Sequence, residues 1–182
     1  MRWNWARLVA LGVFATSSIL LANSSNASEW MYKKEDKAFG ETQATAMAIG
    51  DASVVFVQCS NGELSLNLAT PEDWKDDSEA MNLMVPKIIM ATDGSEPIRY
   101  DVVLGENGLH KLLAKVEDAG SSREAAAKIV EAKKKLEIGI EVGGKRFHAS
   151  KISAAGASKK IQSVLDECGS KQKAESKPDE KK

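Results

Sequence analysis

The chain has 182 residues, with 25 basic and 26 acidic side chains and a formal net charge of −1. This length suits one globular domain. The near balance of charge argues against a nucleic-acid-binding protein, which requires a concentrated basic surface.

Residues 1–27 have the form of a cleavable secretion signal. Arg2 and Arg7 supply a short positive segment, and residues 8–22 are apolar apart from one threonine and two serines. Ser25 and Ala27 place small side chains at the −3 and −1 positions of the expected cleavage site. The apolar run of about 15 residues is shorter than the roughly 20 that a membrane-spanning helix requires. We therefore expect an exported protein with no membrane span after cleavage; a retained N-terminal anchor is the alternative.

The segments that follow the signal alternate in character, as strands do. Residues 29–33 predict a first strand, and residues 42–49 predict a second with small side chains on one face. Residues 53–59 are almost continuously β-branched or aromatic, which predicts a central strand buried on both faces. Asn61-Gly62 then predicts a type I′ turn into a fourth strand over residues 64–68, which has one apolar face.

Residues 71–79 are predicted to form an acidic loop and are the candidate binding site. Carboxylate oxygens suit Ca²⁺, and a cluster of them also suits a cationic partner. The spacing lacks the alternate acids and central glycine of an EF-hand, so a solvated loop without a ligand is the alternative and we expect no cofactor or metal. The residues of this candidate site are Glu72, Asp73, Trp74, Asp76, Asp77 and Glu79.

Two further strands are predicted over residues 85–91 and 98–104, joined by a turn at residues 92–95. Residues 109–116 carry apolar side chains at helical spacing, although a strand is the alternative. Ser121 and Glu124 have the spacing of a capping box, which predicts a helix that begins at Ser121 or the next residue.

The last elements are a second hairpin and a helix. Residues 136–141 alternate in polarity, Gly143-Gly144 turns the chain, and residues 146–149 return. Apolar residues from Ala157 to Cys168 then recur on one face of a helix, which Gly169 is expected to stop. Residues 170–182 carry little to bury and are predicted to form a disordered, charged tail. A single domain over residues 28–169 is therefore expected.

Cys59 and Cys168 are the only cysteines, and both survive signal cleavage. In an oxidising compartment an even pair of cysteines is usually bridged. One lies at the end of the third predicted strand and the other on the apolar face of the last helix, so a strand-to-helix disulfide is expected. Two buried thiols that never meet are the alternative.

No catalytic motif stands out. His110 and His148 are the only histidines, and we expect both at the surface or its boundary. The chain has no HExxH, no CxxC, no GxSxG and no glycine-rich phosphate loop, so zinc, serine-hydrolase and nucleotide chemistry lack their usual residues. Trp30 and Trp74 are expected to cover the core rather than bind a ligand.

The order of elements resembles a family of exported bacterial proteins. The strand ending in Cys59, the Asn61-Gly62 turn, the late hairpin and the helix ending at Cys168 are similar to proteins of the invasion-associated locus B type and to type VI secretion accessory proteins. That resemblance implies a secreted or periplasmic β-rich domain without an established catalytic site. The invasion-associated pattern carries additional cysteines, which this chain lacks.

Together these features predict an α+β fold: an antiparallel sheet, or a curved sandwich, with one or two packed helices and a single disulfide. The hypothesis for function is an exported periplasmic or envelope binding or accessory protein without catalytic activity, with a protein partner in the cell envelope. The alternatives are an envelope hydrolase or hydrolase inhibitor that uses residues 71–79, and a secreted factor that acts on a host. The sequence does not predict an oligomeric state.

Overall fold

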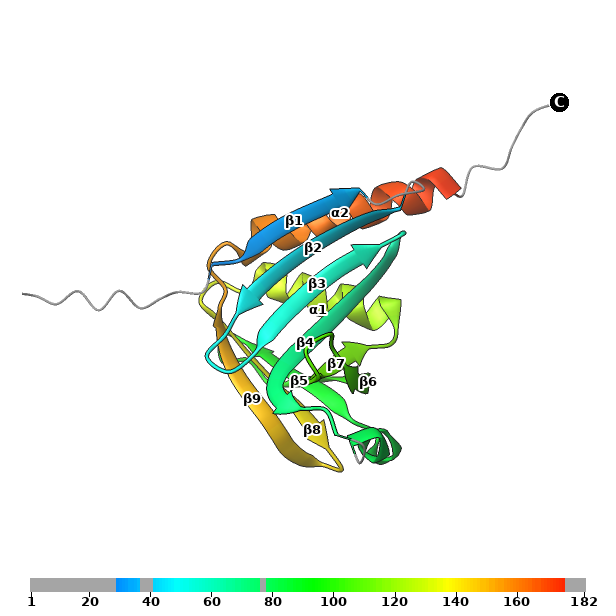
Figure 1. Ribbon diagram of the computed structural model, residues 1–182. Helices are drawn as coiled ribbons and strands as arrows, with labels where there is room; N and C mark the ends of the chain where they lie inside the picture. Colours follow the sequence, from blue (N-terminus) through cyan, green and yellow to red (C-terminus); the bar gives the residue numbers. More distant parts are fainter. Residues whose placement is uncertain (1–28, 37–40, 76–77, 176–182) are drawn as a thin grey trace, which may run out of the picture.

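The computed structural model describes residues 29–36, 41–75 and 78–175, which form one antiparallel sheet with helices packed on it. The nine strands of this part lie in the order β1-β2-β3-β4-β7-β6-β5-β8-β9, and the sheet bends strongly between β1–β4 and β5–β8–β9 (Figure 1). The strands are β1 (Met31–Asp36), β2 (Thr42–Ile49), β3 (Val54–Ser60), β4 (Glu63–Asp73), β5 (Lys87–Thr92), β6 (Ile98–Glu106), β7 (Lys111–Val116), β8 (Lys135–Val142) and β9 (Lys145–Ser153). The helices are the 3₁₀ helix η2 (Ser78–Met84), α1 (Ala119–Glu131) and α2 (Ala157–Glu175).

Helices α1 and α2 pack side by side against β2, β3 and β4, so the α+β fold with two packed helices is confirmed. The second strand presents the alanines at 44, 46 and 48 to this interface, and all three are buried. Such small side chains let α2 approach the sheet closely. From α1, the buried Ser122 hydroxyl accepts a hydrogen bond from Leu66 N–H at 3.2 Å. The apolar face of β4 is therefore covered, and a backbone donor there is satisfied.

The predicted hairpin at Asn61-Gly62 is confirmed. Both residues have positive φ, 52° and 85°, as the two central residues of a type I′ turn require. The strands on either side pair in the register that this turn sets, with Ser60 opposite Glu63 and Val57 opposite Leu66. The leucines at 64, 66 and 68 are buried on the helix-facing side, as their alternation predicts.

Three strand predictions need correction. Strand β3 has neighbours on both edges, but only Val55, Val57 and Cys59 are fully buried, so it is buried on one face and half-buried on the other. The fourth strand runs past Pro71 to Asp73. Proline has no backbone N–H, but Pro71 lies where the register of β4 and β7 shifts, so no hydrogen bond between these strands is lost there. Residues 111–116 form a strand, because pairing with β4 and β6 outweighs the helical spacing.

Both helix boundaries also differ from the predictions. The first helix begins at Ala119, and its cap is Asp118, whose carboxylate accepts a hydrogen bond from Ser121 N–H at 2.6 Å. The last helix passes through Gly169, which does not adopt positive φ, and reaches Glu175 within the segment predicted to be a tail. No helix of the described chain is long and apolar enough to span a membrane. The predicted signal, residues 1–27, and residues 176–182 lie outside the described residues.

The bend brings the β2–β3 turn onto the outer edge of β9. Asp51 N–H donates to Lys151 O at 3.2 Å, and its carboxylate accepts from Lys151 N–H at 2.8 Å and from the Ser150 hydroxyl at 2.7 Å. A Cβ on Gly50 would lie 2.5 Å from Ser150 Oγ and 2.9 Å from Lys151 O, so glycine is required at this approach. The two ends of the sheet are therefore tied together around the core.

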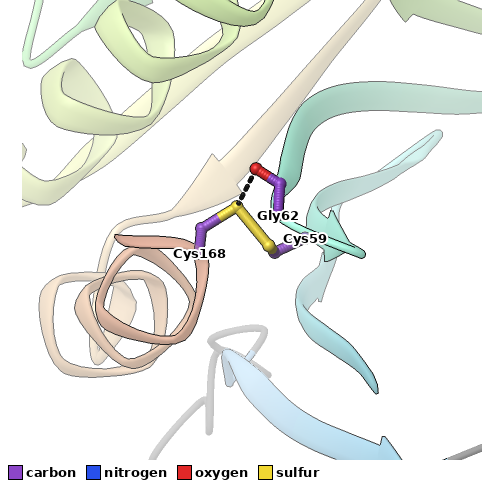
Figure 2. Close-up of a disulfide and its surroundings, with 3 residues drawn as sticks. All are labelled: Cys59, Gly62 and Cys168. Atoms are coloured by element: carbon purple, nitrogen blue, oxygen red, sulfur yellow. Dashed lines mark hydrogen bonds between the residues drawn. A yellow bond between two sulfur atoms is a disulfide. The ribbon is translucent and has the colours of Figure 1, made fainter. Parts of the chain in front are cut away.

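The predicted disulfide is confirmed. It joins Cys59 at the end of β3 to Cys168 in α2, across a sequence separation of 109 residues and a Cα–Cα distance of 5.6 Å. Figure 2 shows the bridge beside the Asn61-Gly62 turn, with the Cys168 sulfur 3.2 Å from Gly62 O. Because a bridged sulfur carries no proton, this is a close contact rather than a hydrogen bond. The bridge fixes α2 to the turn end of the β3–β4 hairpin.

We expect Cys59→Ala together with Cys168→Ala to lower the free energy of unfolding by about 4–5 kcal/mol. The bridge closes a long loop and so reduces the chain entropy of the unfolded state, and the double variant loses this effect. Urea unfolding of both proteins, with and without reductant, measures the loss. Reductant should destabilise the wild-type protein and leave the double variant unchanged. Equal stability of the two oxidised proteins would contradict the prediction.

Candidate functional site

The acidic residues predicted to form one loop are divided between two elements. Glu72 and Asp73 end β4, Glu79 is exposed in η2, and Asp76 and Asp77 lie outside the described residues. The Asp73 carboxylate pairs with the Lys111 ammonium, which lowers the pKa of Asp73. No group of acidic, histidine or cysteine side chains in the described chain is arranged to hold a metal ion. The described acids of the predicted loop therefore lie on β4 and η2, and their binding role stays a prediction.

Glu72 is paired with a histidine from the other end of the sheet. Its Oε1 lies 3.0 Å from Nδ1 of His148, which β9 places on the inner face. Since a carboxylate can only accept, the Nδ1–H of the imidazole donates this bond. His148 is only 6% exposed, and its Nε2 is buried without a hydrogen-bond partner among the described residues. The prediction that His148 lies at the surface or its boundary is therefore wrong.

The Glu72 carboxyl is held in its ionised form. Burial raises its pKa, but the nearby Thr70 hydroxyl, the Glu72 backbone amide and the His148 imidazole together lower it below the ordinary value of 4.5. Hydrogen bonds to the charged form of a carboxyl favour ionisation, and here they exceed the cost of burial. The site therefore has an oriented anion, which is suited to fixing β4 against β9 or to attracting a cation.

A hollow of about 350 Å³ lies beside this pair. Glu72, Asp73 and Lys75 supply its polar wall, and Met81 and Phe147 supply apolar surface. The size is within the roughly 300–1,000 Å³ of small-ligand sites. The two carboxyl groups in its wall, Glu72 and Asp73, both have lowered pKa values, so neither is suited to act as a general acid.

The same end of the sheet exposes an unusual amount of apolar surface. Strand order places η2, the β6–β7 turn and the β8–β9 turn together there, and Gly143 N–H donates to Met84 O at 3.3 Å. Five of the eight large hydrophobic side chains that are exposed in the described chain lie in these segments or within a few residues of them, and Leu83 is 86% exposed. We name this region the η2 surface; its five residues are Leu83, Met84, Val85, Leu109 and Phe147.

Val85 adds backbone strain to the η2 surface. Its φ is +49°, a left-handed conformation that a β-branched residue rarely adopts. The side chain is exposed, so burial of its methyl groups does not compensate for this conformation. Strained residues of this kind concentrate at functional sites, where the surrounding structure holds them in place.

Sequence reasoning missed His148 because of a β-bulge. The pairing of β8 with β9 shifts between Ile140 and Glu141, so that Ile140 faces His148 and Glu141 faces Arg146. Phe147 is the extra residue and is exposed, whereas His148 enters the core. Simple alternation from Phe147 places these two side chains on the wrong faces. Counting back in twos from the buried Ile152 gives the correct face for His148.

The other aromatic and histidine predictions have different outcomes. Trp30 is buried, and its indole N–H donates to Ser153 O at 2.8 Å, so it closes the core beside the end of β9. Trp74 is partly buried against the core, and its backbone N–H donates to His110 O at 2.9 Å. His110 is exposed at the β6–β7 turn, as expected.

Comparison with known proteins adds no relative to this description. No family model, curated protein or solved structure matches the chain.

We expect Glu72→Gln to lower the free energy of unfolding by about 1 kcal/mol at pH 7, because it removes the charge from a partly buried hydrogen bond. The folded-state pKa of Glu72 is lowered, so the contribution of its charge is present above pH 4.5 and is lost as the pH falls through the folded-state value. Denaturant unfolding from pH 7 to pH 3 should therefore show the difference between the two proteins narrowing. Glu79→Gln, at an exposed carboxylate, is the matched control and should change little. A difference that stays constant with pH would contradict this role for Glu72.

Proposed function

We propose that this protein is an exported, non-catalytic binding protein of a bacterial cell envelope, and that it docks a protein partner through the η2 surface. Five exposed apolar side chains at one end of the sheet are the observation that carries the proposal. Monomeric soluble proteins rarely leave such clusters open, and protein interfaces commonly bury them. The strained Val85 within the cluster supports the same reading.

The charge states of the carboxyl groups favour binding over hydrolysis. Where the pKa of a described Asp or Glu departs clearly from its ordinary value, it is lowered. A general acid for glycosidic or peptide cleavage needs a raised pKa so that it holds a proton near neutral pH. The carboxylates of Glu72 and Asp73 therefore suit a charged rim around an apolar contact better than a catalytic pair.

Export rests on separate grounds. The first 27 residues have the positive, apolar and small-residue order of a secretion signal. The Cys59–Cys168 bridge fits an oxidising compartment such as the periplasm. The resemblance to small exported bacterial proteins of the invasion-associated locus B and type VI secretion accessory types supports the same location and a role without catalysis.

We expect the native protein to begin at Ser28 and to occur in the periplasmic fraction. N-terminal sequencing of the protein from fractionated cells of its own host measures both properties. Replacing Ala27 with a bulky residue, Ala27→Leu, should block cleavage because the −1 pocket of the peptidase excludes large side chains. Recovery of a product that begins at Met1 in the cytosol would contradict the proposal, and recovery mainly from the culture medium would favour the factor that acts on a host.

We expect a photo-crosslinking amino acid at position 83 to capture a specific envelope protein in intact cells, and the same probe at position 49 to capture none. Leu83 is 86% exposed and Ile49 is 55% exposed, so both probes are accessible and only their locations differ. A second change on the same surface, Leu109→Glu, should reduce the crosslinked product several-fold because it places a charge in the apolar contact.

Two controls make this experiment decisive. Met31→Glu, an equivalent change on the β1 edge, should leave the crosslink at position 83 unchanged. Circular dichroism of each variant checks that the sheet is intact. Equal crosslinking from positions 49 and 83, or an undiminished product with Leu109→Glu, would contradict docking through the η2 surface.

A further inference from the structure

A second hollow, of about 180 Å³, lies on the outer face of the sheet over β5, β8 and β9. The register places Ile89, Gly139 and Ala149 in one row across these strands, and Ala91, Glu137 and Lys151 in the next. The side chains of the residues between these rows, Met90 and Ile138, belong to the buried core. The hollow is therefore built on the face opposite the core.

The floor of this hollow is apolar. Ile89 is 8% exposed and Ala91 is 7% exposed, although the main helix packing in the described chain is against β1–β4 and β7. Gly139 also lines the hollow and adds no side chain between Ile89 and Ala149. A Cβ there would lie 2.3 Å from His148 O, so the close approach of β8 and β9 itself requires the glycine.

The rim of the hollow carries two cationic side chains, Arg146 and Lys151. The side chains of Arg146 and Lys151 line it and form no hydrogen bond or ion pair with another described residue, although both lie near enough to Glu137 to lower its pKa. The two carboxylates on the rim are engaged. Glu137 accepts from Lys135 Nζ at 2.7 Å, and Asp51 holds Ser150 and Lys151 N–H as part of the sheet closure.

We propose that this hollow binds a small carboxylate with a short apolar body, the body resting on Ile89, Ala91 and Ala149 and the carboxylate lying between Arg146 and Lys151. Guanidinium and ammonium groups donate charge-assisted hydrogen bonds to carboxylate oxygens, and Arg matches their geometry with two parallel bonds. The volume equals about six water volumes of roughly 30 Å³ each, which suits an apolar chain of about half a dozen atoms. This site is independent of the proposed docking of a protein partner.

The test is a titration of the purified, disulfide-bonded protein with sodium hexanoate, followed by amide NMR shifts. A ligand of about eight non-hydrogen atoms in an open hollow should bind with a Kd on the order of 1 mM. The shifts should be largest at Gly139 and Ala149. Hexylamine and hexanol have the same apolar body without the carboxylate, and both should bind more weakly than hexanoate.

Three variants separate the two parts of the site. Ala149→Leu fills the hollow from an exposed strand position and should abolish hexanoate binding. Arg146→Gln together with Lys151→Gln should weaken binding about fivefold, since each exposed ion pair contributes modestly. Lys115→Gln together with Arg123→Gln removes the same charge elsewhere, at exposed positions on β7 and α1, and should leave the affinity unchanged.

Each remaining outcome overturns the proposal. The absence of shifts at Gly139 and Ala149 in 50 mM hexanoate, scaled from the roughly 1 mM expectation, excludes the site. Equal affinity for hexylamine and hexanoate excludes carboxylate recognition. Binding that survives Ala149→Leu in a folded protein, or that falls equally in the Lys115 and Arg123 control, excludes this location.

Discussion

The closure of the sheet on itself positions every other feature of this fold. A flat sheet of nine strands would leave β1 and β9 far apart. The bend instead brings the β2–β3 turn to β9, where the Asp51 carboxylate accepts a hydrogen bond from the backbone N–H of Lys151. One carboxylate oxygen accepts from both the Ser150 hydroxyl and Lys151 N–H, and Gly50 allows the approach. Because these bonds occupy part of the β9 edge, they also remove a stretch of backbone that would otherwise be open to pairing with another chain.

Small and large side chains fill different parts of the core. The buried alanines of β2 and α1 lie where these elements pack against α2, whereas β5 and β8 contribute larger side chains such as Ile88 and Ile140. The disulfide fixes α2 at the end opposite the η2 surface, because Cys59 ends β3 near the Asn61-Gly62 turn. The covalent bridge therefore lies at one end of the molecule, and the exposed apolar side chains of the η2 surface lie at the other.

The sequence predicted correctly those elements that depend on residues close together in the chain. Asn61-Gly62 specifies its turn because both residues accept positive φ, and the spacing from Ala157 to Cys168 specifies one face of a helix, so the hairpin and the disulfide follow from the sequence. Interactions between distant segments decided the rest. Residues 111–116 form a strand only because β4 and β6 lie on either side, and Pro71 remains in a strand only because the partner register shifts there.

The candidate site was predicted less well than the fold, for the same reason. Glu72 belonged to the predicted acidic loop, but its partner His148 is 76 residues away and faces inward because of a bulge that no short pattern in the sequence marks. Sequence spacing groups acids that are neighbours in the chain, whereas the structure places Glu72 on β4 and Glu79 on η2. The imidazole that pairs with Glu72 therefore comes from a distant strand and not from its own stretch of sequence.

The bulge at Phe147 links the interior of the protein to both of its candidate surfaces. One inserted residue sends Phe147 outward toward the hollow beside η2 and sends His148 inward to Glu72. The residues that follow keep this phase, so Ser150 and Ile152 face the core while Ala149 and Lys151 face outward. Removing the bulge would reverse the side chains on one side of it, since a shift of one residue exchanges the faces of a strand. The burial of His148 and the exposure of Phe147 are therefore two consequences of a single irregularity, and neither follows from the polarity of the residue itself.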